Sequence, residues 1–244
     1  MFQAGQARGN VPDNGAGTVS PGKETAMTFE EIRQNEEIRA YMEKGNENLG
    51  VMGFTEHAMA HAMRAAHTAA DILRKLGHEE HEIELAKIAG YMHDIGNCVN
   101  RTDHAHSGAI MAMGILRDMK MAPTDAAVVI AAIGNHDEKK GTAVDAVSAA
   151  LILADKCDVR RSRVRARTQA DFDIHDRVNY AAENSVLSID AQKKTITLDI
   201  TLDDTICSVL DYFEIFTQRM LMCRRAAEKL GCRFCMTANG SKVL

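Results

Sequence analysis

A succession of helical patterns between residues 55 and 160 constrains this chain more than any other feature. Its clearest segment, TEHAMAHAMRAAHTAADILRKL from Thr55 to Leu76, contains neither proline nor glycine, and Gly77 follows where helices commonly end. Further apolar segments with helical spacing follow after short polar connections, among them LAKIAGYM, SGAIMAMGILRDMKM, AAVVIAAIG and AVDAVSAALILADKCD. Aromatic residues make up only 5% of the chain, so small and flexible aliphatic side chains must supply the packing. We therefore expect one all-α unit.

The N-terminal part of the chain divides into an aperiodic tail and a further helix. Residues 1–27 carry glycine, asparagine and proline without periodicity, so we expect a flexible tail. Thr28 and Glu31 have the spacing of a capping box, which predicts a helix that continues to about Lys44. Three glycines then predict a break in the chain before Thr55: Gly45, Gly50 and Gly53.

The C-terminal part of the chain has a different sequence pattern. Ser185–Asp190 and Lys194–Leu202 alternate and are β-branched, which predicts a hairpin. Thr205–Leu230 has the pattern of a helix, and RFCMTANGSKVL reads as two short strands. We predict three parts of the chain: the flexible tail of residues 1–27, a helical metal-binding domain of residues 28–182, and a small α+β unit of residues 183–244.

The charge and composition of the chain exclude some classes of binding partner. The net charge of −5 gives no general attraction to nucleic acid or to an anionic membrane. No apolar run reaches the roughly 18 residues that a membrane-spanning helix needs, and the N-terminus lacks the apolar core of a secretory signal. The six cysteines lie mostly in apolar helical patterns, so we expect reduced thiols and a cytoplasmic protein, with Cys232 and Cys235 as two thiols on a strand.

The stretch AGYMHDIGN, with His93 and Asp94 at its centre, is the strongest candidate for a functional motif. The chain holds two other His-Asp pairs, but the first has further histidines before and after it and an isolated carboxylate, Asp155, in the apolar segment LILADKCD. A buried carboxylate without a partner is unfavourable, and a metal would neutralise it. Imidazoles and carboxylates are ligands of divalent transition metals, so we expect a buried metal site.

The order of these residues resembles the HD-domain superfamily of metal-dependent phosphohydrolases. His61 in HAMRAA, His93-Asp94 in AGYMHDIGN and Asp155 in LILADKCD carry the resemblance, which covers about residues 50–165. His104 in HAHSGA and His136 in IGNHDE resemble positions of the dinuclear branches. The resemblance implies a mainly α fold, an HD-type helical bundle with the metals inside, to which the small C-terminal α+β unit is appended. The chain departs from the branch of the superfamily that cleaves cyclic dinucleotides, because Asn97 stands where that branch has lysine. The GYP triplet of that branch is also absent from this chain.

The resemblance also implies a site and a reaction. Two divalent transition metal ions (Fe, Mn, Zn, Co or Ni) are expected on six ligands: His61, His93, Asp94, His104, His136 and Asp155. Asp94 would bridge the ions, and Asp94 and His93 would be the catalytic residues. The expected reaction is hydrolysis of a nucleotide or another small phosphate ester through metal-activated water, because such a site supplies positioning and charge neutralisation.

Basic side chains near Asp155 are candidates for substrate binding. Arg160, Arg161 and Arg163 follow the Asp155 helix, and Arg64 lies one turn after His61. Guanidinium groups bind phosphate through paired hydrogen bonds, although a solvated helix end would explain the same run, which continues to Arg165 and Arg167. His175-Asp176 is expected at the surface. Four further residues are candidates for outer ligands or pocket residues: His57, His106, Asp137 and His175.

Alternative functions stay open at this point. One is an oxygenase, since some HD-type proteins with two irons use O₂. Another is a non-catalytic nucleotide-sensing module, in which residues 183–244 or a second copy of the chain in a homo-oligomer would transmit the signal. Nucleic-acid binding through RRSRVRAR is disfavoured by the acidic balance and by the absence of interleaved aromatic residues.

Overall fold

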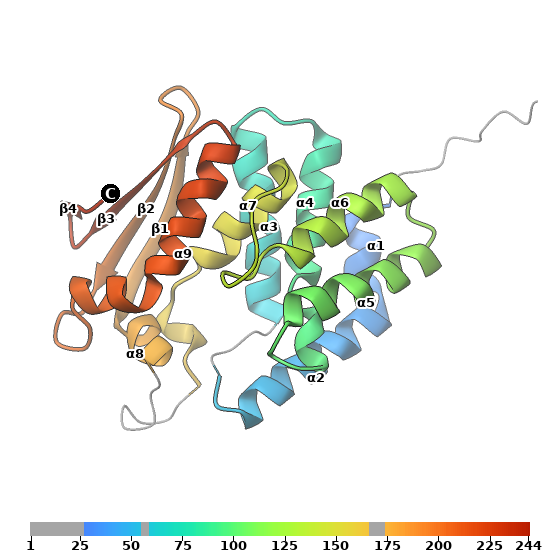
Figure 1. Ribbon diagram of the computed structural model, residues 1–244, viewed down its shortest axis with the longest axis horizontal. Coiled ribbons are helices and arrows are strands. Elements are labelled where there is room, and N and C mark those ends of the chain that lie inside the picture. Colours follow the sequence, from blue (N-terminus) through green and yellow to red (C-terminus); the bar gives the residue numbers. More distant parts are fainter. Residues whose placement is uncertain (1–26, 55–58, 166–173) are drawn as a thin grey trace, which may run out of the picture.

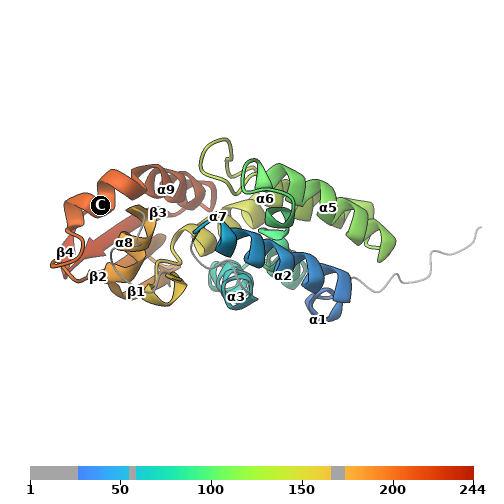
Figure 2. The same ribbon diagram turned by 90° about the horizontal axis from the view of Figure 1, so that it is seen from below.

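The computed structural model describes residues 27–54, 59–165 and 174–244. The helices run in chain order as follows: α1 (Phe29–Gln34), α2 (Glu36–Val51), α3 (Met59–Lys75), α4 (Glu80–Met92), the 3₁₀ helix η1 (Ile95–Cys98), α5 (His104–Asp118), α6 (Pro123–Gly134), α7 (Ala146–Lys156), the 3₁₀ helix η2 (Arg161–Arg163), α8 (Ile174–Ala181) and α9 (Val209–Lys229). The strands are β1 (Ala182–Asp190), β2 (Thr195–Leu202), β3 (Arg233–Ala238) and β4 (Ser241–Lys242). Helices α1–α7 gather at one end of the molecule, and the strands lie at the other end with α8 and α9 (Figures 1 and 2). The mainly α fold with a small C-terminal α+β part is therefore confirmed.

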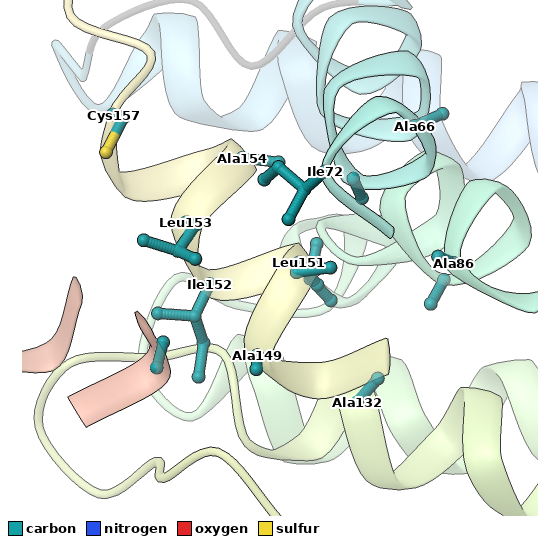
Figure 3. Packing of buried hydrophobic residues seen from close by; sticks show 14 of the residues in the cluster. Ala66, Ile72, Ala86, Ala132, Ala149, Leu151, Ile152, Leu153, Ala154 and Cys157 are labelled. Carbon is teal, nitrogen blue, oxygen red and sulfur yellow. The ribbon is translucent and has the colours of Figure 1, made fainter. Parts of the chain in front are cut away.

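Helix α7 is the centre of the fold. Every one of its residues except Ala146 is buried, and it packs against α3, α4, α6 and α9. Leu151, Ile152 and Leu153 leave the helix in different directions into the packed interior (Figure 3). A helix that is hydrophobic on all sides is stable only when it is surrounded, which explains this position. Asp155, near its C-terminal end, is thereby held inside the protein.

A close crossing of α3 and α4 brings two parts of the candidate site together. A Cβ atom added to Gly90 on α4 would lie 2.7 Å from both the Cα and the backbone nitrogen of Ala66 on α3. Only glycine leaves room for this approach, and alanines line the facing surface of α3. The crossing places His61, on α3, beside the end of α4, which carries His93.

The N-terminal helices correct part of the sequence prediction. The capping box is present, since the backbone nitrogen of Thr28 donates to Glu31 at 2.8 Å. However, Asn35 ends α1 and caps α2, because its Oδ1 accepts a hydrogen bond from the backbone nitrogen of Ile38 at 3.0 Å. The predicted breaks at Gly45 and Gly50 are wrong, because α2 continues through both residues to Val51. Gly45 instead permits close packing on η1, where an added Cβ would lie 3.0 Å from the backbone nitrogen of Cys98.

The C-terminal strands form one sheet in the order β1-β2-β3-β4. The predicted hairpin is confirmed, because β1 and β2 pair antiparallel; β3 pairs parallel to β2, and helix α9 connects these two strands. Alternate residues of β2 are buried on the face that packs against α9. The hydrophobic core is continuous from Phe29 to Ala238, so α9 joins the sheet to the helical bundle. The division of the chain at residue 183 stays a prediction.

Two further features concern the length of the helices and the state of the cysteines. Within the described ranges, no helix is both long enough and apolar enough to cross a lipid bilayer. All six cysteines carry free thiols, with the Sγ atoms of Cys157 and Cys223 3.8 Å apart in the core between α7 and α9.

Candidate metal centre

The six predicted metal ligands converge in the interior, although five separate segments carry them. His61 lies on α3, His93 ends α4 and Asp94 follows it, His104 begins α5, His136 follows α6, and Asp155 lies near the end of α7. None of the six is more than 7% exposed. Gly96 in η1 packs closely on the start of α5, where an added Cβ would lie 2.0 Å from the carbonyl oxygen of His104. Glycine therefore lets η1 and α5 deliver their side chains to one centre.

The two carboxylate oxygens of Asp94 face different histidines. Its Oδ2 lies 3.2 Å from His93 Nε2 and 3.8 Å from His61 Nε2. Its Oδ1 lies 3.4 Å from His104 Nε2 and 3.8 Å from His136 Nε2. Asp94 thus stands between two groups of nitrogen donors.

Asp155 belongs to the first of these two groups. Its Oδ1 lies 3.3 Å from His61 Nε2 and 3.8 Å from His93 Nε2. Two overlapping sets of donor atoms each fit within a span of 4.8 Å: His61, His93 and Asp155, and His93, Asp94 and His136. The geometry is compatible with one metal ion or with two.

The Nδ1 atom of each histidine faces an oxygen acceptor. The acceptors are Asp158 Oδ2 for His61 at 2.7 Å, the Gly90 carbonyl for His93 at 2.8 Å, the Arg101 carbonyl for His104 at 3.1 Å, and the Ile133 carbonyl for His136 at 2.7 Å. Because these oxygens accept hydrogen bonds, the proton of each neutral imidazole lies on Nδ1, and the Nε2 lone pair points inward. Such outer hydrogen bonds are the usual support of metal-binding histidines.

The inward-facing nitrogens need a cation. The Nε2 atoms of His104 and His136 lie 3.1 Å apart, and two unprotonated nitrogens at that distance repel each other. His93 Nε2 is buried and, among the described residues, has no hydrogen-bond partner. A divalent transition metal satisfies such nitrogens and the adjacent carboxylates, so the donor set fits the expected ion.

Burial and neighbouring charges keep most of these groups in the form that binds metal. Burial lowers the pKa of His136 well below its usual value, and it lowers the pKa of His104 too. Burial also opposes ionisation of Asp155, but Lys156, His61 and His93 together outweigh that effect and hold the pKa of Asp155 well below its usual value. For His93, burial lowers the pKa, but the carboxylates of Asp94 and Asp155 and the carbonyl of Gly90 together outweigh it, so the pKa is raised and protons compete with metal at this residue.

Three residues that the sequence prediction missed support the ligands. Lys156 Nζ lies 2.7 Å from Asp155 Oδ2 and 2.8 Å from Glu138 Oε2. Asp158 holds His61, and Asn97 Nδ2 donates to Asp94 Oδ1 at 2.9 Å. A lysine at the end of a helix ordinarily interacts with the helix dipole, so nothing in its sequence context indicates burial. Asp158, three residues after Asp155, could have been found as a second carboxylate on the same turn.

The arginines predicted to bind substrate do not form one cradle. Asp158 accepts hydrogen bonds from Arg160, at 2.7 Å to Nε, and lies 3.5 Å from Arg64 Nε. Arg161 donates to the carbonyl of Tyr180, so its side chain is directed to α8. Arg163 is buried and donates to the Asp158 carbonyl at 3.0 Å. Substrate binding by these four residues stays a prediction.

The other candidate residues differ in how far they are exposed to solvent. His106 is exposed, whereas Asp137 is half-buried. The prediction that His175-Asp176 lies at the surface is wrong for Asp176, which is 3% exposed because α8 packs onto the core. His175 stacks on Phe216 of α9, with ring centroids 6.1 Å apart. His57 and Arg167, and the tail of residues 1–26, lie outside the described residues.

Two hollows that share lining residues lie beside the centre. The inner cavity is lined by Asp94, Arg101, His104, His136, Asp155, Lys156, Arg163 and Arg219. The outer cleft, of about 540 Å³, is lined by Met52, Phe54, Asn100, Arg101, Thr102, Asp103, Asp137, Glu138, Lys139, Lys140, His175 and Arg219. Arg101 and Arg219 line both, so they stand where the two meet.

Comparisons with known proteins place the chain in a family. It is 24% identical over 202 residues to the uncharacterized protein MJ1020 of Methanocaldococcus jannaschii, which covers 73% of this chain and 77% of that protein. It is 30% identical over 121 residues to ribonuclease Y of Campylobacter concisus, which covers 49% of this chain but only 21% of that protein. A crystal structure of a predicted HD superfamily hydrolase from an uncultured Thermotogales bacterium matches 55% of this chain and 75% of that one, with 25% identity and a TM-score of 0.41. The profile of the HD domain matches residues 59–214, and the chain therefore belongs to the HD domain family.

Proposed function

We propose that this protein is a metal-dependent phosphohydrolase that cleaves a small phosphate ester, such as a nucleotide. The observation that carries the proposal is the position of Asp94 between two groups of histidine Nε2 atoms whose lone pairs face inward. His61, His93, Asp94 and Asp155 would hold one ion, and Asp94, His104 and His136 a second. A divalent metal at such a site supplies Lewis acidity toward phosphoryl oxygens and lowers the pKa of water to about 7.

The protein's own residues supply charge and exclusion of solvent. The ligands are almost fully buried, so electrostatic interactions at the centre are weakly screened. Lys156 and Arg163 are each about 5% exposed and line the inner cavity, where their positive charges favour an anionic transition state. This excess of cations supports phosphate chemistry over the oxygenase alternative.

The size of the outer cleft supports a small substrate. Its volume of about 540 Å³ falls in the range of roughly 300–1,000 Å³ that is typical of pockets for small molecules. The likeness to ribonuclease Y makes RNA a second candidate substrate. The net charge of −5 gives no general attraction to a polyanion, so we favour the small ester.

The test joins metal analysis to a screen for hydrolysis. Purified protein is analysed for bound transition metals and then assayed with p-nitrophenyl phosphate, its diester, mononucleotides and a single-stranded RNA oligonucleotide, while O₂ consumption is followed in parallel. We expect bound metal and release of phosphate or nucleotide, both lost in Asp94→Asn. The control is Asp118→Asn, at an exposed carboxylate on α5. Folded protein that takes up no transition metal, or hydrolysis that survives Asp94→Asn, would overturn the proposal.

A further inference from the structure

The wall of the inner cavity carries more positive than negative charge. Its cations are Arg101, Lys156, Arg163 and Arg219, and its carboxylates are Asp94 and Asp155. Cations beside a metal site weaken the binding of metal ions, so metal binding alone does not explain them. A phosphate group, in contrast, is attracted by each of the four cations.

Two of the four cations are held by the protein itself. Lys156 lies between Asp155 and Glu138, with an oxygen of each within 2.8 Å of its Nζ atom. Arg163 donates to the backbone of Asp158 at 3.0 Å. Both contribute charge to the cavity from fixed positions in its wall. Arg101 and Arg219 differ from them because they also line the outer cleft, through which a substrate would enter.

Arg219 is oriented but retains hydrogen-bonding capacity. Its guanidinium lies 4.2 Å over the ring of Phe216, and its Nε is 3.4 Å from Glu138 Oε1. In the described part of the chain, Glu138 is its sole carboxylate partner, whereas a guanidinium has five N–H donors. The side chain is 18% exposed. The stacking and the single ion pair thus fix Arg219 while donors are left for a ligand.

Arg101 lies between η1 and α5, far from Arg219 in the sequence. Its Nη1 lies 3.1 Å from His104 Nε2 and 3.9 Å from Asp94 Oδ1. A metal held by His104 uses the same lone pair, so the guanidinium of Arg101 then becomes available to another acceptor. Its side chain is 25% exposed, and it stands beside the ligands at the entrance to the inner cavity.

We propose that Arg101 and Arg219 together bind the phosphoryl oxygens of a phosphate monoester whose organic group lies in the outer cleft. This assignment rests on the proposed function and adds to it the residues that select the substrate. Arg219 belongs to α9, which connects β2 to β3, so the C-terminal part of the chain completes the substrate site. The outer cleft offers Phe54, His175 and Lys140 to the organic group.

The test uses inorganic phosphate as the probe. Metal-loaded protein is titrated with phosphate by calorimetry, comparing wild type with Arg219→Gln, Arg101→Gln and the charge-conserving Arg219→Lys. The matched control is Arg224→Gln, also on α9, where Arg224 is 54% exposed and lies 4.0 Å from Glu228. We expect each glutamine variant to weaken phosphate binding at least about 10-fold, as loss of a charged hydrogen bond predicts, and the lysine variant to retain part of the affinity.

The metal content of every variant is measured together with its thermal unfolding. Unchanged metal content with weakened phosphate binding supports the assignment, and wild-type phosphate affinity in both glutamine variants overturns it. If Arg219→Gln does not fold, Arg219→Lys and Arg101→Gln decide the matter in the same titration. Phosphate binding that depends on these arginines without hydrolysis of any ester would refute the proposed function and leave this assignment standing.

Discussion

Asp158 Oδ2 lies 2.7 Å from His61 Nδ1, so a carboxylate outside the predicted ligand set orients the first of the predicted metal ligands. Burial works to raise the pKa of Asp158, but hydrogen bonds from His61 and Arg160 outweigh it and hold the pKa below its usual value. Asp158 is therefore ionised at neutral pH and accepts a hydrogen bond from His61 Nδ1. This pairing leaves His61 Nε2 directed at Asp155 and Asp94.

Asp158→Asn should weaken metal binding without removing a ligand. Loss of an outer carboxylate partner of a metal-binding histidine typically costs about 10–100-fold in metal affinity. Competition titration with a chromogenic chelator measures this affinity, with Asp118→Asn as the surface control. An affinity equal to wild type would show that His61 keeps its orientation without Asp158.

Removal of metal should lower the thermal stability. An ion that binds only the folded state at roughly 1,000 times its Kd stabilises that state by about 4 kcal/mol. For chains of this size each kcal/mol corresponds to about 2–4 °C in Tm. We expect dialysis against EDTA to lower Tm and added Mn²⁺ or Zn²⁺ to restore it, as followed by circular dichroism. Asp94→Asn should show no such response, because it lacks the shared ligand.

Gly90→Ala should destabilise the bundle. The added Cβ would lie 2.7 Å from the backbone of Ala66, which forces α3 and α4 apart and costs about 1–3 kcal/mol. Gly114→Ala on α5 is the matched control, because nothing lies within 4 Å of its added Cβ. There the substitution should stabilise the helix by about 0.5–1 kcal/mol. Urea unfolding of both variants gives the comparison, and equal effects would contradict the close crossing.

Stability should fall at alkaline pH through Tyr212. Burial raises the pKa of Tyr212 well above its usual value, and its hydroxyl donates to the Met220 sulfur, at 3.7 Å. Because the folded state holds this proton more tightly than the unfolded state, the stabilisation is complete below about pH 10. It is lost progressively as the pH rises above that value toward the folded-state pKa.

Tyr212→Phe removes this titration. Its free energy of unfolding should therefore fall less steeply than that of wild type between pH 10 and 12, as urea titrations at each pH would measure. Parallel curves for the two proteins would show that Tyr212 ionises in the folded state at its ordinary pKa.

The sequence by itself determined the elements whose signals are local. Gly77 ends the helix that carries His61 and has a φ of +82°, as its position after an apolar helix predicts. The hairpin of β1 and β2 follows from the alternation of β-branched residues on either side of a short polar turn. The six predicted ligands could be named because the chain resembles the HD superfamily at His61, His93-Asp94, His104, His136 and Asp155, and the structure gathers these residues in one place.

Tertiary structure alone decided what surrounds those ligands. Asp158 meets His61 and Arg219 meets Glu138 through the packing of helices, although the two members of each pair are far apart in the chain. Charged residues on neighbouring turns look alike in a sequence whether they face solvent or a buried site. Their partners, burial and pKa depend on the distances between helices, which close crossings such as that of Gly90 and Ala66 set and which no local pattern encodes.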